Sequence, residues 1–187
     1  MKITFSTYLT LLRLIGAPII IPFCIVNFAP QNNCSINLLI AALFLFFGLT
    51  DFLDGFFARK YGQETKLGAA LDHIADKFLV FSALVALLAV GKISYVWVIA
   101  LIGREFFMMS LREIALENHI KIQVSPWGKL KTVIHIMLIT WLIMNPIQGA
   151  ASCVFSGIKI LLLVTSIIIS WASALDYVRR LYSQFKK

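Results

Sequence analysis

Long runs of apolar residues, separated by short polar segments, constrain this chain more than any other feature. The six runs cover residues 9–28, 36–57, 67–90, 94–116, 132–144 and 158–175. Most of them approach the ~20 residues that an α-helix needs to cross a bilayer. Hydrophobic residues make up 60% of the chain, whereas a soluble domain carries about 45–50%. The sequence therefore predicts an all-α integral membrane protein with six transmembrane helices.

The organisation of the chain is simple. We find no linker, low-complexity segment or internal repeat, so we expect a single membrane domain over residues 1–187. Residues 2–10 are mixed in polarity and predict a short interfacial segment that runs into the first span. A cleaved signal peptide is the alternative, but Arg13 interrupts the apolar run and no convincing cleavage site follows. Pro126, which follows Ser125, predicts a helix start there.

The distribution of basic residues predicts the orientation. The segments 59–66 and 112–131 and the C-terminal tail hold most of the Lys and Arg, whereas the other side carries Lys92 and Lys159. By the positive-inside rule, both termini are then cytoplasmic. The net charge of +8 comes from 17 Lys and Arg against 9 Asp and Glu. Because this charge lies between membrane spans, anionic lipids and a phosphate-bearing substrate explain it better than nucleic acid.

Four aspartates lie where the second span ends and the third begins. Asp51 and Asp54 are three residues apart, and Asp72 and Asp76 are four apart, so each pair occupies one helix face. Carboxylates at membrane depth are costly and by default mark a functional site. Four together would raise one another's pKa unless a cation intervenes. We therefore expect one or two Mg²⁺ or Mn²⁺ ions, which prefer oxygen ligands.

The residues between the aspartates suit a pyrophosphate. Gly55 has no side chain, which lets a ligand approach the helix backbone, and Ala58 keeps that approach open one turn later. Arg59 offers a fork of donors suited to phosphate. A helix hairpin that neutralises itself is the alternative, but Arg59 and Lys77 are too few to balance four acids. Together these residues describe a site for a nucleotide diphosphate.

The whole stretch from Asp51 to Asp76 resembles the signature of the CDP-alcohol phosphatidyltransferases. The pattern D-x2-D-G-x2-A-R-x8-G-x3-D-x3-D is matched in full by Asp51, Asp54, Gly55, Ala58, Arg59, Gly68, Asp72 and Asp76. The resemblance implies a CDP-diacylglycerol substrate bound by Asp51, Gly55, Ala58, Arg59, Gly68 and Asp72. It also implies metal ligation by Asp51, Asp54, Asp72 and Asp76. We expect Asp76 to act in addition as the catalytic general base.

A second resemblance concerns the acceptor. The segments 103–105 (GRE), 110–113 (SLRE) and 127–132 (WGKLKT) resemble those of bacterial phosphatidylglycerophosphate synthases. This implies transfer of the phosphatidyl group to glycerol 3-phosphate, in phosphatidylglycerol synthesis. Basic side chains suit that dianion, and the expected ligands of its phosphate are Arg104, Arg112, Lys129 and Lys131. Residues 10–13 (TLLR) resemble a T-x-x-R near the family's N-terminus, which places Arg13 near the site unless it only snorkels to the interface.

Other functions remain open. The same chemistry could use serine, inositol phosphate or phosphatidylglycerol as the acceptor. A divalent-cation transporter is the alternative from another class, but transporters usually hold ions near the bilayer midplane, whereas all four aspartates lie at one face.

The resemblance also bears on assembly and location. It implies a homodimer. The positive-inside orientation puts the four aspartates at the cytoplasmic ends of the second and third spans, so we expect a protein of the cell (inner) membrane with its active site facing the cytoplasm. Cys34 and Cys153 both fall in outward loops, so a disulfide between them is one option. Asp176 and Arg179, three residues apart after the last span, predict a surface ion pair.

Overall fold

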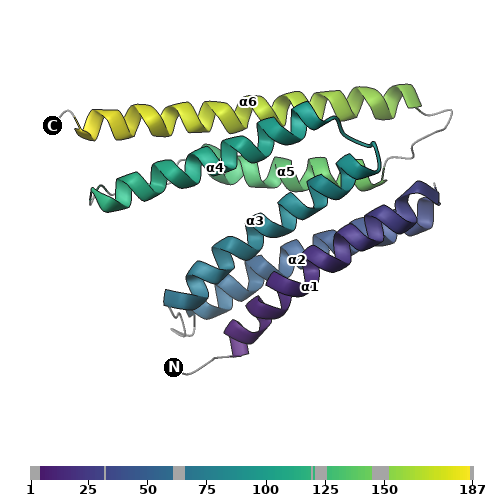
Figure 1. The fold of residues 1–187 in the computed structure, drawn as a ribbon, viewed down its shortest axis with the longest axis horizontal. Coiled ribbons are helices and arrows are strands. Elements are labelled where there is room, and N and C mark those ends of the chain that lie inside the picture. The colour runs from purple at the N-terminus through teal and green to yellow at the C-terminus, as the bar shows by residue number, and fades with distance from the viewer. Residues whose placement is uncertain are drawn as a thin grey trace. The chain divides into compact units, whose positions relative to one another are not determined.

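The computed structural model describes residues 5–31, 33–60, 66–118, 120, 126–144 and 152–185. Side chains are described at 15–31, 33–49, 74, 75, 77–118, 120, 130–144 and 156–184. These residues are helical apart from short turns and contain no strand, which confirms the all-α prediction. The elements, shown in Figure 1, are α1 (Phe5–Phe28), the 3₁₀ turn η1 (Ala29–Gln31), α2 (Cys34–Lys60), α3 (Lys66–Ala89), α4 (Tyr95–Glu117), α5 (Pro126–Met144) and α6 (Ser152–Phe185).

Each expected span corresponds to one helix, and α1, α2, α5 and α6 are longer than the apolar runs. α5 begins at Pro126, as the sequence predicts, and α6 continues to Phe185 rather than ending at residue 175. The predicted partner of Asp176 was wrong. Its carboxylate forms an ion pair with Arg180, at 3.0 Å from Nε, because side chains four residues apart meet on one helix face.

Membrane crossing is supported by length and composition at one helix. Among the described residues, the stretch Ser156–Gln184 of α6 is long and apolar enough to cross a bilayer, and an 18-residue segment within it has a mean hydropathy of 2.1. Shorter apolar stretches are Ile15–Gln31, Cys34–Leu49, Lys77–Ala89 and Leu130–Met144. Six crossings and cytoplasmic termini therefore stay predictions.

The helices form two compact units. The first contains α1, α2, α3 and the end of α5, and the second contains α4, the start of α5 and α6.

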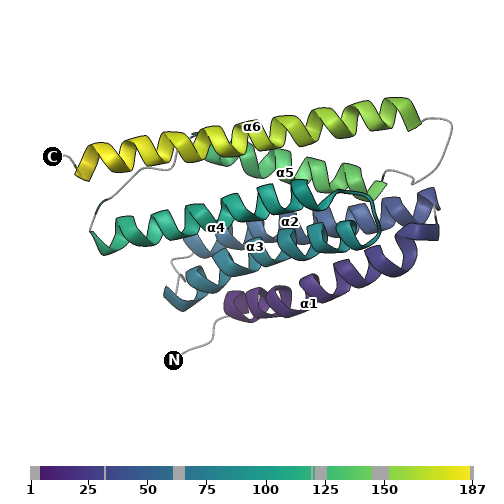
Figure 2. The same cartoon turned by 45° about the horizontal axis from the view of Figure 1, so that its top comes forward.

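In the first unit, α1 packs against both α2 and α3. Ala17, Ile21 and Ile25 recur every four residues on α1 and are fully buried. Ala83 and Ala86 of α3 are buried as well, and such small residues let helices approach closely. The three helices alternate in direction, so the start of α1, the end of α2 and the start of α3 lie at the same end of the unit (Figures 1 and 2).

A buried lysine in the turn between α3 and α4 reaches the end of α5. Lys92 is 6% exposed, and its Nζ donates a hydrogen bond to the Ile143 carbonyl at 2.8 Å. α5 ends at Met144, and the last carbonyls of a helix lack intrahelical partners and favour a cation. Burial lowers the pKa of the Lys92 ammonium from 10.5 to about 8. Lys92 therefore stabilises a helix end and carries a proton that binds less tightly than usual.

The lowered pKa of Lys92 predicts how stability changes with pH. Between pH 8 and 10.5 the unfolded chain binds more protons at this site than the folded chain, so the free energy of unfolding should rise with pH there, by at most ~1.4 kcal/mol per pH unit. Lys92→Met should remove this rise, and Lys159→Met, which changes a half-buried lysine of α6, should keep it. Unfolding in detergent across this pH range measures the effect. An identical pH dependence in the wild type and Lys92→Met would contradict the assignment.

In the second unit, the buried face of α4 carries charge. Its apolar members include Leu101 and Met108, and Arg104 and Glu105 fall between them on the same buried stripe. α4 also contacts α6 through Phe107, whose ring stacks on Trp171 with centroids 6.5 Å apart. A charged pair inside such a stripe needs partners from the neighbouring helices.

Candidate functional site

The structure places the four aspartates on two consecutive helices of the first unit. Asp51 and Asp54 lie in the last turns of α2, and Asp72 and Asp76 lie in the first three turns of α3. Helical geometry therefore keeps each pair on one face, as the spacing predicts. Their side chains lie outside the described ones, and so do those of the other signature residues Ala58 and Arg59.

The chemistry of this donor set fits a hard divalent cation. The four aspartates offer oxygen donors only, which Mg²⁺ and Mn²⁺ prefer over softer metals. Both pairs belong to the end of the first unit at which α2 stops and α3 starts. Among the described side chains, no group of three His, Cys, Asp or Glu could hold a metal ion, so that part of the chain offers no competing site.

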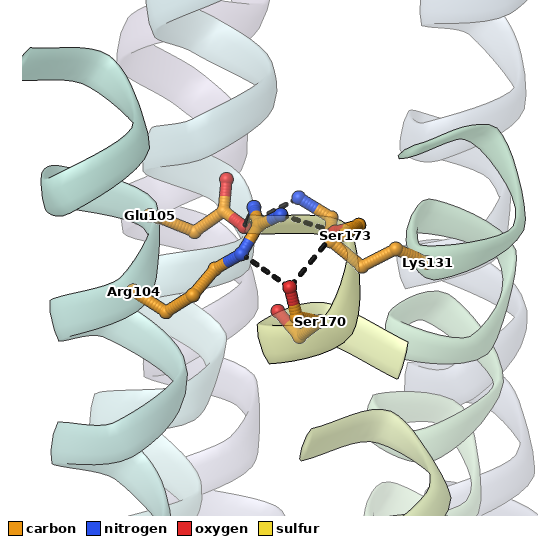
Figure 3. Close-up of polar contacts among 5 residues, drawn as sticks. All are labelled: Arg104, Glu105, Lys131, Ser170 and Ser173. Carbon is orange, nitrogen blue, oxygen red and sulfur yellow. Dashed lines mark hydrogen bonds and ion pairs between the residues drawn. The ribbon is translucent and has the colours of Figure 1, made fainter. Parts of the chain in front are cut away.

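A buried polar cluster occupies the second unit (Figure 3). Glu105 Oε1 accepts a hydrogen bond from Arg104 Nη1 at 2.8 Å and another from Lys131 Nζ of α5. Arg104, Glu105 and Lys131 are 3%, 5% and 6% exposed. The shared carboxylate thus joins α4 to α5.

α6 completes the cluster from the other side. Arg104 Nε donates to the Ser170 carbonyl at 2.9 Å, and Nη2 donates to Ser173 Oγ at 2.5 Å. Ser173 in turn donates to the Ser170 carbonyl at 2.8 Å. Two cations and one carboxylate leave these residues with a net charge of +1 (2 − 1) when all are ionised. Guanidinium and ammonium groups are also the donors that bind phosphate oxygens in proteins.

The structure thus brings together two of the four expected acceptor ligands. Arg104 and Lys131 meet through Glu105, whereas Arg112 lies two turns further along α4 and is half-buried. Lys129 belongs to the first turn of α5, and its side chain lies outside the described ones.

Three members of the cluster had no predicted role. Glu105 stands beside Arg104 in the GRE segment, which is the signal that could have revealed it. Ser170 and Ser173 are three residues apart on α6, with Ser166 a turn earlier, so a stripe of serines in an apolar helix was the available signal.

Comparison with known proteins decides the family. The sequence profile described as CDP-alcohol phosphatidyltransferase matches residues 3–175. The chain belongs to the CDP-alcohol phosphatidyltransferase family. This confirms the resemblance and the prediction of an enzyme, since members of the family are phosphatidyltransferases. The match includes both aspartate pairs and the buried cluster of the second unit.

Curated relatives align over nearly their whole length. A Rickettsia typhi protein is 34% identical over 96% of this chain and 93% of its own length. A Haemophilus influenzae protein is 34% identical over 92% of this chain and 90% of its own. A Wigglesworthia glossinidia brevipalpis protein is 36% identical over 95% of this chain and 94% of its own. Each of the three is named CDP-diacylglycerol–glycerol-3-phosphate 3-phosphatidyltransferase.

Proposed function

We propose that this enzyme transfers the phosphatidyl group from CDP-diacylglycerol to sn-glycerol 3-phosphate, giving phosphatidylglycerophosphate and CMP. The observation that carries the proposal is the alignment of the chain, over more than nine tenths of its length, with relatives named for that reaction. The buried Arg104 and Lys131, which both donate to Glu105, support an anionic acceptor, since guanidinium and ammonium groups bind phosphate. The product lies on the route to phosphatidylglycerol.

The aspartates and Arg59 would bind the nucleotide lipid. Asp51, Asp54 and Asp72, with a contribution from Asp76, would hold one or two Mg²⁺ or Mn²⁺ ions, which when bound neutralise charge on the pyrophosphate and on the departing CMP. Arg59 would donate hydrogen bonds to the pyrophosphate. Gly55, Ala58 and Gly68 would leave space for the substrate against the helix backbone.

Asp76 would act as the general base. Its carboxylate would take the proton from the acceptor hydroxyl of glycerol 3-phosphate. The acceptor oxygen would then form a bond to the phosphorus next to diacylglycerol, the bond from that phosphorus to the bridging oxygen would break, and CMP would leave with that oxygen. The acceptor phosphate would be bound by some of Arg104, Arg112, Lys129 and Lys131.

Arg112 offers a test of the acceptor site. Arg112→Ala should raise the KM for glycerol 3-phosphate by about 10–100-fold, because a hydrogen bond to a charged group is lost. The KM for CDP-diacylglycerol should change much less. Steady-state CMP release at varied concentrations of each substrate measures both constants. Arg179→Ala, at an exposed position of α6, serves as the control, and a defect in Arg112→Ala confined to the lipid substrate would refute the role.

The remaining predictions concern assembly and location. We propose a multi-pass protein of the inner membrane with six spans, both termini cytoplasmic and the active site on the cytoplasmic side. The basic segments of the sequence support this orientation. We also propose one functional domain, in keeping with the family match over residues 3–175, and a homodimer. Cys34 is an exposed free thiol at the start of α2, and the side chain of Cys153 lies outside the described ones.

The reaction is tested by CMP release from purified protein in detergent. The assay contains CDP-diacylglycerol and Mg²⁺, with glycerol 3-phosphate added or omitted, and a parallel sample contains EDTA. We expect release that depends on glycerol 3-phosphate, is abolished by EDTA and is restored by excess Mg²⁺ or Mn²⁺. Release with serine, inositol phosphate or phosphatidylglycerol instead would keep the chemistry and overturn the acceptor. Unchanged release in EDTA would overturn the metal site.

A further inference from the structure

The guanidinium of Arg104 is held along one edge by α6. Its Nε and Nη2 donate to the Ser170 carbonyl and to the Ser173 hydroxyl, and that hydroxyl donates its own proton to the same carbonyl (Figure 3). The three contacts form a closed ring. The Ser173 hydroxyl donates its single proton to the Ser170 carbonyl, and the Ser173 oxygen accepts from Arg104. Both serines are buried, Ser170 fully. The orientation of the guanidinium therefore depends on α6 as well as on Glu105.

Arg104 keeps donors for a further ligand. A guanidinium has five N–H groups, and the contacts with Ser170, Ser173 and Glu105 use one on each nitrogen. One N–H on each Nη then remains, and no contact among the described residues uses either. Buried donors of a charged group are costly when unpaired. Two N–H groups in the fixed plane of a guanidinium are suited to phosphate oxygens.

We propose that Ser173 is a positioning residue for the acceptor phosphate. It fixes the Arg104 guanidinium against α6, so that the two remaining N–H groups are already oriented when glycerol 3-phosphate binds. An arginine that must be ordered during binding loses affinity through side-chain entropy. The inference rests on the proposed function, since it takes Arg104 as a ligand of glycerol 3-phosphate.

α6 supplies a matched control for this role. Ser166 lies one turn before Ser170, is 1% exposed, and has a hydroxyl with no partner among the described residues. Ser166→Ala therefore makes the same chemical change, at an equally buried position of the same helix, without removing a contact to Arg104.

The test measures kcat and the KM for each of the two substrates in steady-state CMP release. Ser173→Ala should raise the KM for glycerol 3-phosphate about tenfold, because it removes a hydrogen bond to a charged group. The kcat and the KM for CDP-diacylglycerol should stay within about twofold of wild type, and Ser166→Ala should match wild type throughout. Ser173→Thr keeps the hydroxyl and should behave like wild type. Ser173→Val has the same shape as threonine without the hydroxyl and should behave like Ser173→Ala.

Other results would contradict either the proposed function or the positioning role of Ser173. If the wild type releases no CMP with glycerol 3-phosphate, the proposed function is wrong. If the wild type is active and Ser173→Ala leaves the KM for glycerol 3-phosphate unchanged, the positioning role is wrong. A fall in kcat alone, equal increases in both KM values, or loss of folded protein in both Ser173→Ala and Ser173→Val would give Ser173 a purely structural role and overturn the proposal.

Discussion

Asp76→Asn is expected to lower the rate of CMP release by a factor of ~10²–10⁴, the usual contribution of a general base. Asparagine has nearly the shape of aspartate and keeps one oxygen, but it cannot take a proton from the acceptor hydroxyl. Binding of CDP-diacylglycerol should be largely spared. Turnover measured at saturating substrates, together with equilibrium binding of the nucleotide lipid in detergent, separates the two effects.

The control for Asp76→Asn is the same substitution at an aspartate outside the proposed site. Asp176→Asn removes the same charge from the last part of α6, where Asp176 pairs with Arg180 at the surface, and it should leave turnover unchanged. If Asp76→Asn weakens lipid binding as much as it slows turnover, Asp76 acts only as a metal or substrate ligand and another group must be the base.

Glu105→Gln is expected to lower the free energy of unfolding by about 3–5 kcal/mol, the usual cost of removing one partner from a buried ion pair. The substitution keeps the size of the side chain but removes the carboxylate charge that Arg104 and Lys131 share. Because both cations are also proposed to bind the acceptor, activity should fall as well. Thermal or denaturant unfolding of the purified protein in detergent measures the loss.

An exposed glutamate on the same helix provides the comparison for Glu105. Glu113 lies eight residues further along α4 and is exposed. Glu113→Gln should change stability by less than about 0.5 kcal/mol. If Glu105→Gln also changes the free energy of unfolding by less than about 0.5 kcal/mol, the ion pairs of Glu105 do not stabilise the fold.

Most of the fold could be predicted because apolar runs report directly on helices. The ends of α6 could not, because hydropathy falls after residue 175 while helical periodicity continues. Leu181 is buried and Asp176 meets Arg180 four residues later, so the polar segment continues the same helix faces. A pair three residues apart was an equally good interpretation of the sequence, because a helix brings both neighbours close, and only the observed side-chain contact distinguishes the two.

The candidate site, like the fold, could be predicted only in part. The positions of the aspartates follow from local spacing, so their placement on α2 and α3 could be predicted. The environment of Arg104 could not, because its partners on α6 are a main-chain carbonyl and a hydroxyl that carry no distinctive pattern. Lys131 was expected to contact substrate, and the structure adds that Glu105 binds it as well. Sequence reasoning identifies charge, but not which charges share a partner.

The distant partners of Arg104 have a consequence for biosynthesis. Lys131 lies 26 residues after Glu105, and Ser170 lies 66 residues after Arg104. At about 5–20 residues per second, a ribosome needs roughly 3–13 s to add those 66 residues. If α4 crosses the bilayer as proposed, it enters with a charged pair at its centre and without the contacts from α6 that hold it, and lipid is a poor environment for such a helix. α4 would therefore remain beside the insertion machinery until α6 emerges, and a chain truncated before Ser170 would expose α4 to membrane quality control.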